Sequence, residues 1–422
     1  MKLELPFGKA SISADFRTPR RCAKLIPKNI ATLQKPEHIL NQALAKPLGS
    51  YQLEQSFGNA GRVGIVVADD LHNSGGEIFL PLVLERLYRL GIQARDISVL
   101  VGGEWGAQQN GVAALLGSPD SHGRRPRVYY HDCNDANNVA YVGQTRRGTP
   151  VFVNRLLLDV DMTIMCGTIR HDPFAGYSGG PSLVLPNCVG SDTLERHFSH
   201  SLDSRDGRLH PACLAGVVQG NPIQEDRREA FRCITTNFAL HTVLNTRGQM
   251  IGAYAGEPLQ SYAAGCHLVD DLFRVPISEL ADIVIVSCDS GSDGRNFREA
   301  YRALHHAMRA VEPGGVIILI AECIEGLGSV QLQRWFEQAE SLGVNSSNAH
   351  NRDGLIAMST WQKAHDFNVI MVTSLDGNLV QRMGFRPATD LDQAIRTARS
   401  LRADLNSCYV IPDGNATVPY LT

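Results

Sequence analysis

Long apolar runs are absent from this sequence. No stretch of its 422 residues approaches the roughly 18 uninterrupted apolar side chains that a membrane-spanning helix needs. The opening residues, MKLELPFGK, also lack the apolar core of a secretory signal. We therefore expect neither membrane insertion nor secretion, and we place the protein in the cytoplasm.

Paired cysteines and a strong net charge are also missing. The ten cysteines run from Cys22 to Cys408 without a CxxC pair or a short even framework, which is typical of reduced, mostly buried thiols. The net charge of −3 gives no general attraction to nucleic acid or to an anionic membrane. No Walker A loop occurs, and no GxGxxG follows the first predicted strand. The expected partner is a small molecule, and the oligomeric state stays undefined.

Short β-branched runs alternate with helical stretches along most of the chain. The first strand is predicted at Val63–Ala68, and an amphipathic helix follows around Ile78–Leu90. Further buried strands are predicted at Ile97–Val101, Val128–His131, Met162–Cys166, Ile283–Ser287, Val316–Ala321, Val369–Thr373 and Tyr409–Ile411. Because helical stretches separate most of these strands, the pattern predicts an α/β protein with largely parallel sheets flanked by helices.

Two features refine this architecture. Residues 238–245 and 250–254 alternate like two strands joined by the turn TRGQ, so we expect a hairpin and a mixed sheet. A Pro-containing segment, Arg274–Glu279, precedes a second βαβ series, which puts a domain boundary near Val275. The strand-like closing segment is expected to return to the first domain. The predicted domains are therefore residues 1–274 plus 405–422, and residues 275–404.

The densest motif is GTIRHDPFAGYSGGPSLVLP, from Gly167 to Pro186. Its glycines permit close backbone approach to a ligand and leave amide N–H groups free to bind an anion. Within it, Phe174–Gly180 (FAGYSGG) resembles the FAG(F/Y)SGG signature of the nickel-pincer lactate racemase (LarA-like) family. Members of that family racemise or epimerise 2-hydroxy acids with a nickel-pincer nucleotide.

Three further segments resemble motifs of the same family, and they occur in the same order and at roughly the same spacing. They are NTRGQMIGAYAG at Asn245–Gly256, RNFREAYRA at Arg295–Ala303 and IPDG at Ile411–Gly414. The resemblance implies a cofactor cleft between two domains and a small 2-hydroxy acid or sugar acid as substrate. An interdomain cleft is also where ligands bind by default.

Racemisation requires acid/base groups on two faces of a tetrahedral carbon. Asp172 aligns with one catalytic histidine of the family, and His171 precedes it; this pair can transfer a proton, or His171 can pack while Asp172 binds the following loop amides. Arg170 can clamp a carboxylate or be solvated. The loop for the opposed histidine contains only Glu104 as a titratable group, with Trp105 as a pocket wall; a solvated Glu104 and an anchoring Trp105 are the alternative.

Three further residues complete the predicted substrate site. Asp69 follows the first strand, where open α/β sheets bind ligands, and aligns with a family aspartate. His72 takes the place of a substrate-binding arginine, although imidazole holds a carboxylate less securely. Arg302 keeps a positive charge where we align a family lysine, or is one more solvated arginine.

The cofactor positions differ from the family pattern. The resemblance implies that the cofactor contacts Ser178, Gly179 and Gly180. Ser182 replaces the lysine that tethers the nucleotide, so a pincer cofactor would be held noncovalently. The nickel-binding histidine aligns with Phe198, between His197 and His200, which share a helix face and can bind a metal or simply be packed or solvated.

These residues predict an isomerase, a racemase or epimerase of 2-hydroxy acids. Loss of both opposed histidines and of the tether leaves two alternatives open. One is a noncatalytic ligand-binding paralogue. The other is a metal-free acid/base enzyme on the same fold, such as one that eliminates water from a sugar acid through Asp172 or His171.

Overall fold

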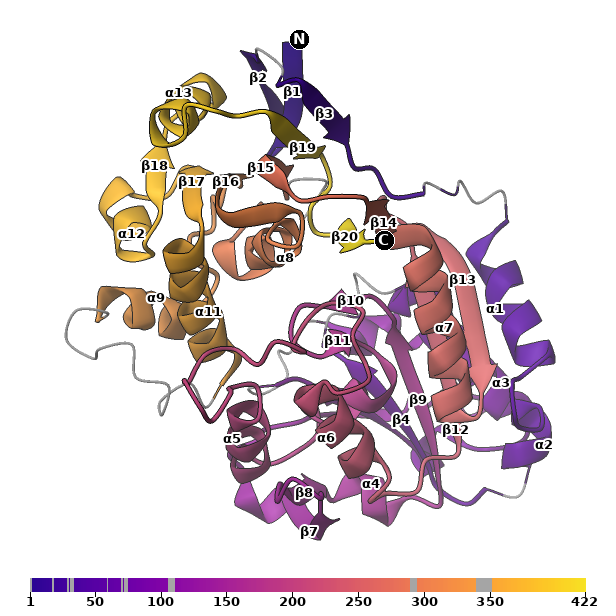
Figure 1. Cartoon of the computed structure of the whole chain (residues 1–422). Helices are drawn as coiled ribbons and strands as arrows, with labels where there is room; N and C mark the ends of the chain where they lie inside the picture. The colour runs from indigo at the N-terminus through magenta and orange to yellow at the C-terminus, as the bar shows by residue number, and fades with distance from the viewer. Residues whose placement is uncertain are drawn as a thin grey trace. The chain divides into compact units, whose positions relative to one another are not determined.

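The computed structural model describes residues 2–16, 19–28, 30, 34–58, 60–69, 71, 75–104, 111–288, 294–338 and 351–422. The chain forms two compact units, drawn in Figure 1. Unit 1 comprises Met1–Lys28, Ser201–Ala215 and Asp271–Thr422, and unit 2 comprises Asn29–His200 and Gly216–Asp270. No helix in the described ranges is both long and apolar enough to cross a bilayer. All ten cysteines have free thiols.

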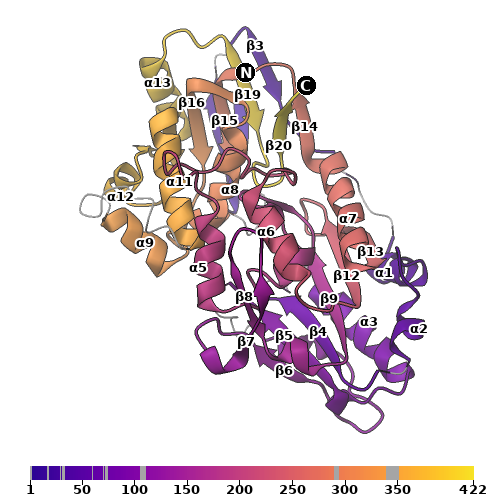
Figure 2. The same cartoon turned by 60° about the horizontal axis from the view of Figure 1, so that its bottom comes forward.

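Unit 2 is built on a mixed six-stranded sheet with the order β13-β12-β9-β4-β5-β6 (Figure 2). Its parallel strands are β4 (Val63–Ala68), β5 (Ile97–Gly102), β6 (Arg127–Tyr130), β9 (Met162–Thr168) and β12 (Phe238–Leu244). Strand β13 (Met250–Gly256) runs antiparallel to β12, which confirms the predicted hairpin and the mixed sheet. The turn between them closes with a 2.8 Å hydrogen bond from the Asn245 N–H to the Gln249 carbonyl.

Three helices cover one face of this sheet. They are α1 (Pro36–Ala45), α2 (Leu53–Phe57) and α3 (Gly76–Arg89). Helix α3 buries Phe79, Leu80, Val83, Leu84 and Leu87, a spacing that puts all five on one side of a helix. Alternate residues of β4, Val63, Ile65 and Val67, face the same core because successive strand residues point to opposite faces.

Unit 2 has further strands and helices outside this sheet. They include the hairpin β7 (Val139–Gln144) and β8 (Pro150–Asn154), the short pair β10 (His171–Asp172) and β11 (Gly176–Tyr177), the helices α4 (Leu156–Asp159), η5 (Gly180–Leu183), α5 (Ser191–Ser199) and α6 (Pro222–Phe231), and most of α7 (Pro258–Phe273). Helix α6 begins with a side-chain cap, since Asn221 accepts from the Ile223 N–H at 3.1 Å.

Unit 1 contains a second six-stranded sheet with the order β18-β17-β16-β15-β19-β3, and every neighbouring pair is parallel. Its strands are β3 (Arg21–Lys24), β15 (Ala281–Ser287), β16 (Val311–Ile320), β17 (Asn368–Val372), β18 (Arg386–Ala388) and β19 (Ser407–Ile411). Its helices are α8 (Phe297–Ala307), α9 (Val330–Glu337), α11 (Arg352–Asp366), α12 (Gly377–Arg382) and α13 (Leu391–Leu401). Two strand pairs complete it: β1 (Lys2–Phe7) with β2 (Ala10–Asp15), and β14 (Arg274–Ile277) with β20 (Val418–Leu421).

This division differs from the predicted one at both ends of the chain. Residues 405–422 were expected in the first domain, yet β19 hydrogen-bonds with β15 on one side and β3 on the other. The first 28 residues also belong to unit 1. The physical reason is that β19 is buried along most of its length, so both of its edges need hydrogen-bonding partners, and β15 and β3 provide them.

Candidate active site

The strand order of unit 2 reverses at β4. From β4 the chain proceeds to β5 and β6 on one side, and later to β9 and β12 on the other. Ligands of open parallel sheets bind at the carboxyl ends of the strands where the order reverses. Asp69 follows β4, Glu104 lies just past β5, and the segment 170–172 follows β9. The fold therefore brings these predicted site residues to one edge of one sheet.

His171 is held by a carboxylate at this edge. The residue is 4% exposed, and its Nε2 lies 2.9 Å from Oδ1 of Asp270 on α7. Its ring packs against Tyr177 with centroids 5.3 Å apart. A carboxylate on one ring nitrogen fixes the tautomer and the orientation of an imidazole. His171 and Asp270 thus form a histidine–carboxylate dyad, the arrangement used to transfer protons.

Sequence reasoning named His171 but missed Asp270. The two residues lie 99 positions apart, and Asp270 sits on a helix that carries no recognised motif. Only the packing of α7 beside the loop after β9 reveals the pair. No periodicity or spacing in the sequence could have found it.

Asp172 stabilises the loop that follows it. Its Oδ1 accepts hydrogen bonds from the backbone N–H groups of Phe174, at 2.9 Å, and Ala175, at 2.8 Å. This geometry matches the alternative in which Asp172 binds the following amides. A catalytic role for Asp172 stays a prediction, and the geometry favours His171 for that role.

The glycines of the FAGYSGG loop bring the chain close to itself. Gly176 has φ +83°, and a Cβ there would lie 2.3 Å from the Val217 carbonyl oxygen. Gly180 has φ +51°, and a Cβ there would lie 2.5 Å from the Tyr262 ring. Both positions therefore require glycine for backbone conformation and for packing. The close approach that the sequence analysis expected towards a ligand is, at these two glycines, an approach to neighbouring protein.

The hydroxyl residues of this loop are also engaged locally. The Ser178 N–H donates to the Arg170 carbonyl at 2.9 Å, and its hydroxyl lies 3.4 Å from the same oxygen. A Cβ on Gly179 would lie 2.9 Å from the Thr168 carbonyl oxygen. Ser182, in η5, is 9% exposed, and its N–H donates to the Gly179 carbonyl. A role for these residues in cofactor binding stays a prediction.

His197 is fully buried on α5 and bound to a carboxylate. Its Nδ1 lies 2.7 Å from Oδ2 of Asp226 on α6, and both side chains have no exposed surface. Asp226 also accepts from the Thr145 hydroxyl at 2.6 Å. Burial lowers the pKa of His197, although the Asp226 carboxylate opposes this. The buried Nε2 of His197 has no hydrogen-bond partner within the described residues.

His200 joins the same network from the end of the helix. Its Nε2 lies 2.9 Å from the Thr149 hydroxyl oxygen, which also lies 3.1 Å from Asp226. Burial lowers the pKa of His200 to about 4. Across the described ranges, no cluster of three or more His, Cys, Asp or Glu side chains could hold a metal. The described residues thus link His197 and His200 through Asp226 and Thr149, and a metal ligand among them stays a prediction.

The other predicted site residues lie on different elements or are not among the residues that the structure describes. Arg302 is on α8 of unit 1, its side chain is 12% exposed, and its Nη2 lies 3.7 Å from the Glu299 carboxylate. Arg170 is half-buried beside His171. His72 and Trp105 lie outside the described residues.

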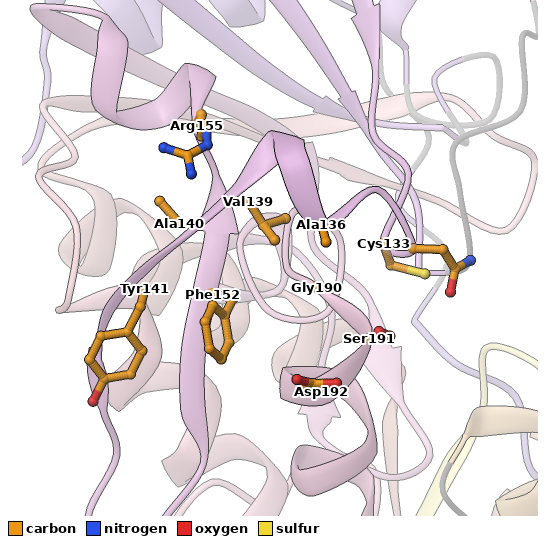
Figure 3. A pocket seen from close by; sticks show the side chains of 11 residues that line it. Cys133, Ala136, Val139, Ala140, Tyr141, Phe152, Arg155, Gly190, Ser191 and Asp192 are labelled. Atoms are coloured by element: carbon orange, nitrogen blue, oxygen red, sulfur yellow. The ribbon is translucent and has the colours of Figure 1, made fainter.

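A hollow of about 340 Å³ opens elsewhere on unit 2, between the β7–β8 hairpin and the first turn of α5 (Figure 3). It is lined by Cys133, Asn134, Ala136, Val139, Ala140, Tyr141, Phe152, Arg155, Gly190, Ser191 and Asp192. None of the predicted site residues is in its wall. The hollow is therefore distinct from the edge that carries His171.

Comparison with known proteins defines the class. A family model described as the lactate racemase N-terminal domain matches residues 7–208, and one described as the lactate racemase C-terminal domain matches residues 277–418. The two models together cover most of the chain. The protein belongs to the lactate racemase family, and the family is one of isomerases.

Individual relatives match this chain over nearly its full length. The chain is 26% identical to the lactate racemase of Thermoanaerobacterium thermosaccharolyticum, covering 99% of this chain and 98% of that one. It is 24% identical to the lactate racemase of Lactiplantibacillus plantarum, with 98% of each chain covered. The solved apoprotein of the Thermoanaerobacterium enzyme matches with a TM-score of 0.86 over 100% of both chains. A Thermotoga maritima protein, 18% identical, shares the fold with a TM-score of 0.61 over 92% of this chain and 98% of that one.

Proposed function

We propose that this protein is a racemase or epimerase of a small 2-hydroxy acid or sugar acid, and that His171 transfers the proton of the substrate hydroxyl. The observation that carries the proposal is the His171–Asp270 dyad at the sheet edge where the strand order of unit 2 reverses. The lactate racemase relatives support a substrate of this kind.

The dyad defines how His171 would act. If its Nε2–H donates to Asp270, the lone pair for accepting a proton is on Nδ1. Removing the proton of the C2 hydroxyl would favour loss of the C2 hydrogen as a hydride, because the carbon then becomes a carbonyl. A bound hydride acceptor would have to take up this hydride and return it. Asp270 stabilises the imidazolium that forms, and the proton returns when the C2 hydrogen is replaced on the other face.

Charged residues of the same edge would bind the substrate. Arg170 directly precedes His171 and supplies a guanidinium that can bind the substrate carboxylate. Asp69 and Glu104 follow neighbouring strands and are the candidates for hydrogen bonds to substrate hydroxyls. The predicted location of this site in a cleft between the two domains stays a prediction, as does a contribution from Arg302.

The described residues fit a noncovalently held nickel-pincer nucleotide better than a tethered one. His197 has Nδ1 bound to Asp226 and a buried Nε2 without a hydrogen-bond partner in the described part of the chain, which is how metal-binding imidazoles are commonly held. Ser182 cannot form the lysine-type link. We propose that His197 would be the imidazole ligand of such a group. When bound, the group would supply an acceptor for the hydride of C2.

The test measures exchange and racemisation directly. Protein is purified from cells with and without the enzymes that make the pincer nucleotide, and nickel content is measured by elemental analysis. D- and L-2-hydroxy acids and aldonic acids are then incubated with each preparation. Chiral chromatography detects inversion, and NMR in D2O detects exchange at C2. The expected result is racemisation of at least one acid.

Variants decide the role of His171. His171→Asn should reduce the rate by about 10²–10⁴-fold because the proton acceptor is lost. His122→Asn, at an exposed turn, is the matched control and should keep full activity. Substrate binding without inversion or exchange in any preparation would overturn the proposal and favour a ligand-binding paralogue. Dehydration of a sugar acid in nickel-free protein would favour the metal-free alternative.

A further inference from the structure

Two cysteines from opposite ends of the chain lie side by side in the sheet of unit 1. Strand β3 pairs in parallel with β19, and Cys22 is the register partner of Cys408. Register partners on neighbouring strands lie about 4.8 Å apart and point to the same face. The Cα atoms of a disulfide are usually about 4.4–6.8 Å apart, so this spacing permits a bond.

The two thiols differ in accessibility. Cys22 is half-buried, on a strand at the end of the sheet, whereas Cys408 is 2% exposed within the apolar cluster around β15 and β19. The hydrogen bond from Cys408 lowers the pKa of Cys22 to about 7 against the effect of burial, and Lys24 assists. The same contact and burial raise the pKa of Cys408. Cys22 is therefore the more acidic and the more accessible of two neighbouring thiols.

We propose that Cys22 and Cys408 form a reversible oxidation site whose substrate is a peroxide. The Cys22 thiolate attacks one peroxide oxygen of hydrogen peroxide, the O–O bond breaks, and the product is a Cys22 sulfenic acid plus hydroxide, which becomes water on protonation. The Cys408 sulfur then attacks the Cys22 sulfur, the S–OH bond breaks, and a second water leaves. Overall, two thiols are oxidised to one disulfide and one peroxide is reduced to two waters.

The bond would join the first and last parts of the chain. Strand β3 leads directly into Leu25–Lys28, where the first segment of unit 1 ends. A link between β3 and β19 closes a loop that includes nearly the whole chain, and such a constraint acts mainly on the unfolded state. Oxidation should therefore raise the thermal unfolding temperature, and a thiol reductant should restore the original value.

The experiment treats the purified full-length protein with hydrogen peroxide and blocks the remaining thiols. Two of the ten thiols should be lost, and peptide mapping should find Cys22 linked to Cys408. Dithiothreitol should restore both thiols. In Cys22→Ser and in Cys408→Ser the linked peptide and the rise in unfolding temperature should be absent.

Cys233→Ser is the matched control, because Cys233 is the other cysteine that is not fully buried. This variant should form the Cys22–Cys408 bond as the parent protein does. If Cys408→Ser fails to fold, Cys22→Ser alone gives the same readout, since it changes the more exposed thiol. Oxidation that stops at a Cys22 sulfinic acid, a bond that involves Cys233, or retention of all ten thiols would overturn the proposal.

Discussion

Buried titratable groups of the two units can have different partners. In unit 2, two of the buried imidazoles are bound to carboxylates: His171 to Asp270 at 2.9 Å and His197 to Asp226 at 2.7 Å. A carboxylate fixes the ring and balances the charge that the ring acquires on protonation. Each pair therefore fixes the orientation of one buried imidazole of unit 2.

In unit 1, a buried cation has hydroxyl groups as hydrogen-bond partners. Lys363 on α11 is 3% exposed, its Nζ lies 3.0 Å from the Tyr301 hydroxyl of α8, and it also donates to the Ser359 hydroxyl. Tyr301 in turn donates to Ser359 at 2.6 Å. Because desolvation dominates, the pKa of Lys363 falls to about 7.

The partners of these groups indicate different roles: the His171–Asp270 pair lies at the candidate site, whereas the Lys363 network connects two helices. Hydroxyl partners satisfy the donors of Lys363 but supply no opposite charge, so the amine carries a cost that it would not carry in water. This network joins α8 to α11. Carboxylate-bound imidazoles occur in unit 2, at and behind the edge that carries the candidate site. We expect substitutions in the His171–Asp270 pair to change activity, and substitutions in the fully buried networks of either unit to change stability.

The largest effect is expected from breaking the His197–Asp226 pair. Asp226→Ala leaves His197 and Thr145 without a fully buried acceptor, so the free energy of unfolding should fall by about 3–5 kcal/mol. Urea denaturation followed by circular dichroism measures the change. Asp192→Ala, at an exposed position in the first turn of α5, should cost less than about 1 kcal/mol. Equal losses in the two variants would show that the buried His197–Asp226 pair contributes no more to stability than an exposed carboxylate does.

Replacing Lys363, whose ammonium group is bound by hydroxyls, should instead raise the free energy of unfolding. Lys363 has a pKa of about 7 in the folded protein, against an ordinary value of 10.5, so between these pH values the unfolded chain binds more protons and stability rises with pH. Lys363→Met should therefore stabilise the protein at pH 7 by on the order of 3 kcal/mol, and the gain should disappear towards pH 10. Thermal unfolding across this range checks it, with the exposed Lys46→Met as control. Destabilisation at pH 7 would contradict this prediction, because it would mean that the hydrogen bonds of Lys363 stabilise the protein by more than burial of its charge costs.

A smaller effect should come from the carboxylate of the proposed catalytic dyad. Asp270→Asn keeps the size of the side chain but removes the charge that stabilises a protonated His171, so the rate should fall by about 10–100-fold. The acidic limb of the pH–rate profile should also shift to lower pH, because the imidazole becomes less basic. Asp271→Asn, the exposed neighbour, is the control. An unchanged profile with reduced stability would give Asp270 a purely structural role.

The smallest effect concerns acid stability. Burial lowers the pKa of His200 from 6.5 to about 4, so between these values the unfolded chain binds the extra proton and stability falls as the pH is lowered. Because His200 is only half-buried, solvent screening reduces the effect of this shift, and His200→Gln should remove on the order of 1 kcal/mol of the loss between pH 6.5 and pH 4. Thermal unfolding at several pH values measures it, and His122→Gln should leave the slope unchanged. An unchanged slope for His200→Gln would separate His200 from the buried network of unit 2.

Most strands could be predicted from the sequence because each carries its own signal. Runs such as Val63–Ala68 are apolar on both faces, as strands buried between layers must be, and the 238–254 region alternates around a glycine-containing turn. Strand β3 has no such signal: its residues 21–24 (RCAK) are mostly exposed, and it becomes a strand only because β19 needs a partner on its open edge.

The candidate site was predictable only in part. The FAGYSGG motif and the loop positions identified Asp69 and the residues 170–172, because the carboxyl ends of parallel strands always share one edge. The sequence could not choose between a proton-transferring and a loop-binding role for His171 and Asp172. The structure adds which carboxylate binds His171 and which backbone amides bind Asp172, and a catalytic role for either residue stays a prediction.

The sequence by itself determined the family, the α/β class, the hairpin and the glycine-rich loop, since these depend on local patterns and on ordered motifs. Tertiary structure alone decided that Asp270 orients His171, that Asp226 joins His197 to His200, and that Cys22 meets Cys408. The reason is physical: a hydrogen bond or a thiol contact depends on a few ångströms in space, and residues far apart along the chain reach that distance only when the whole fold is in place.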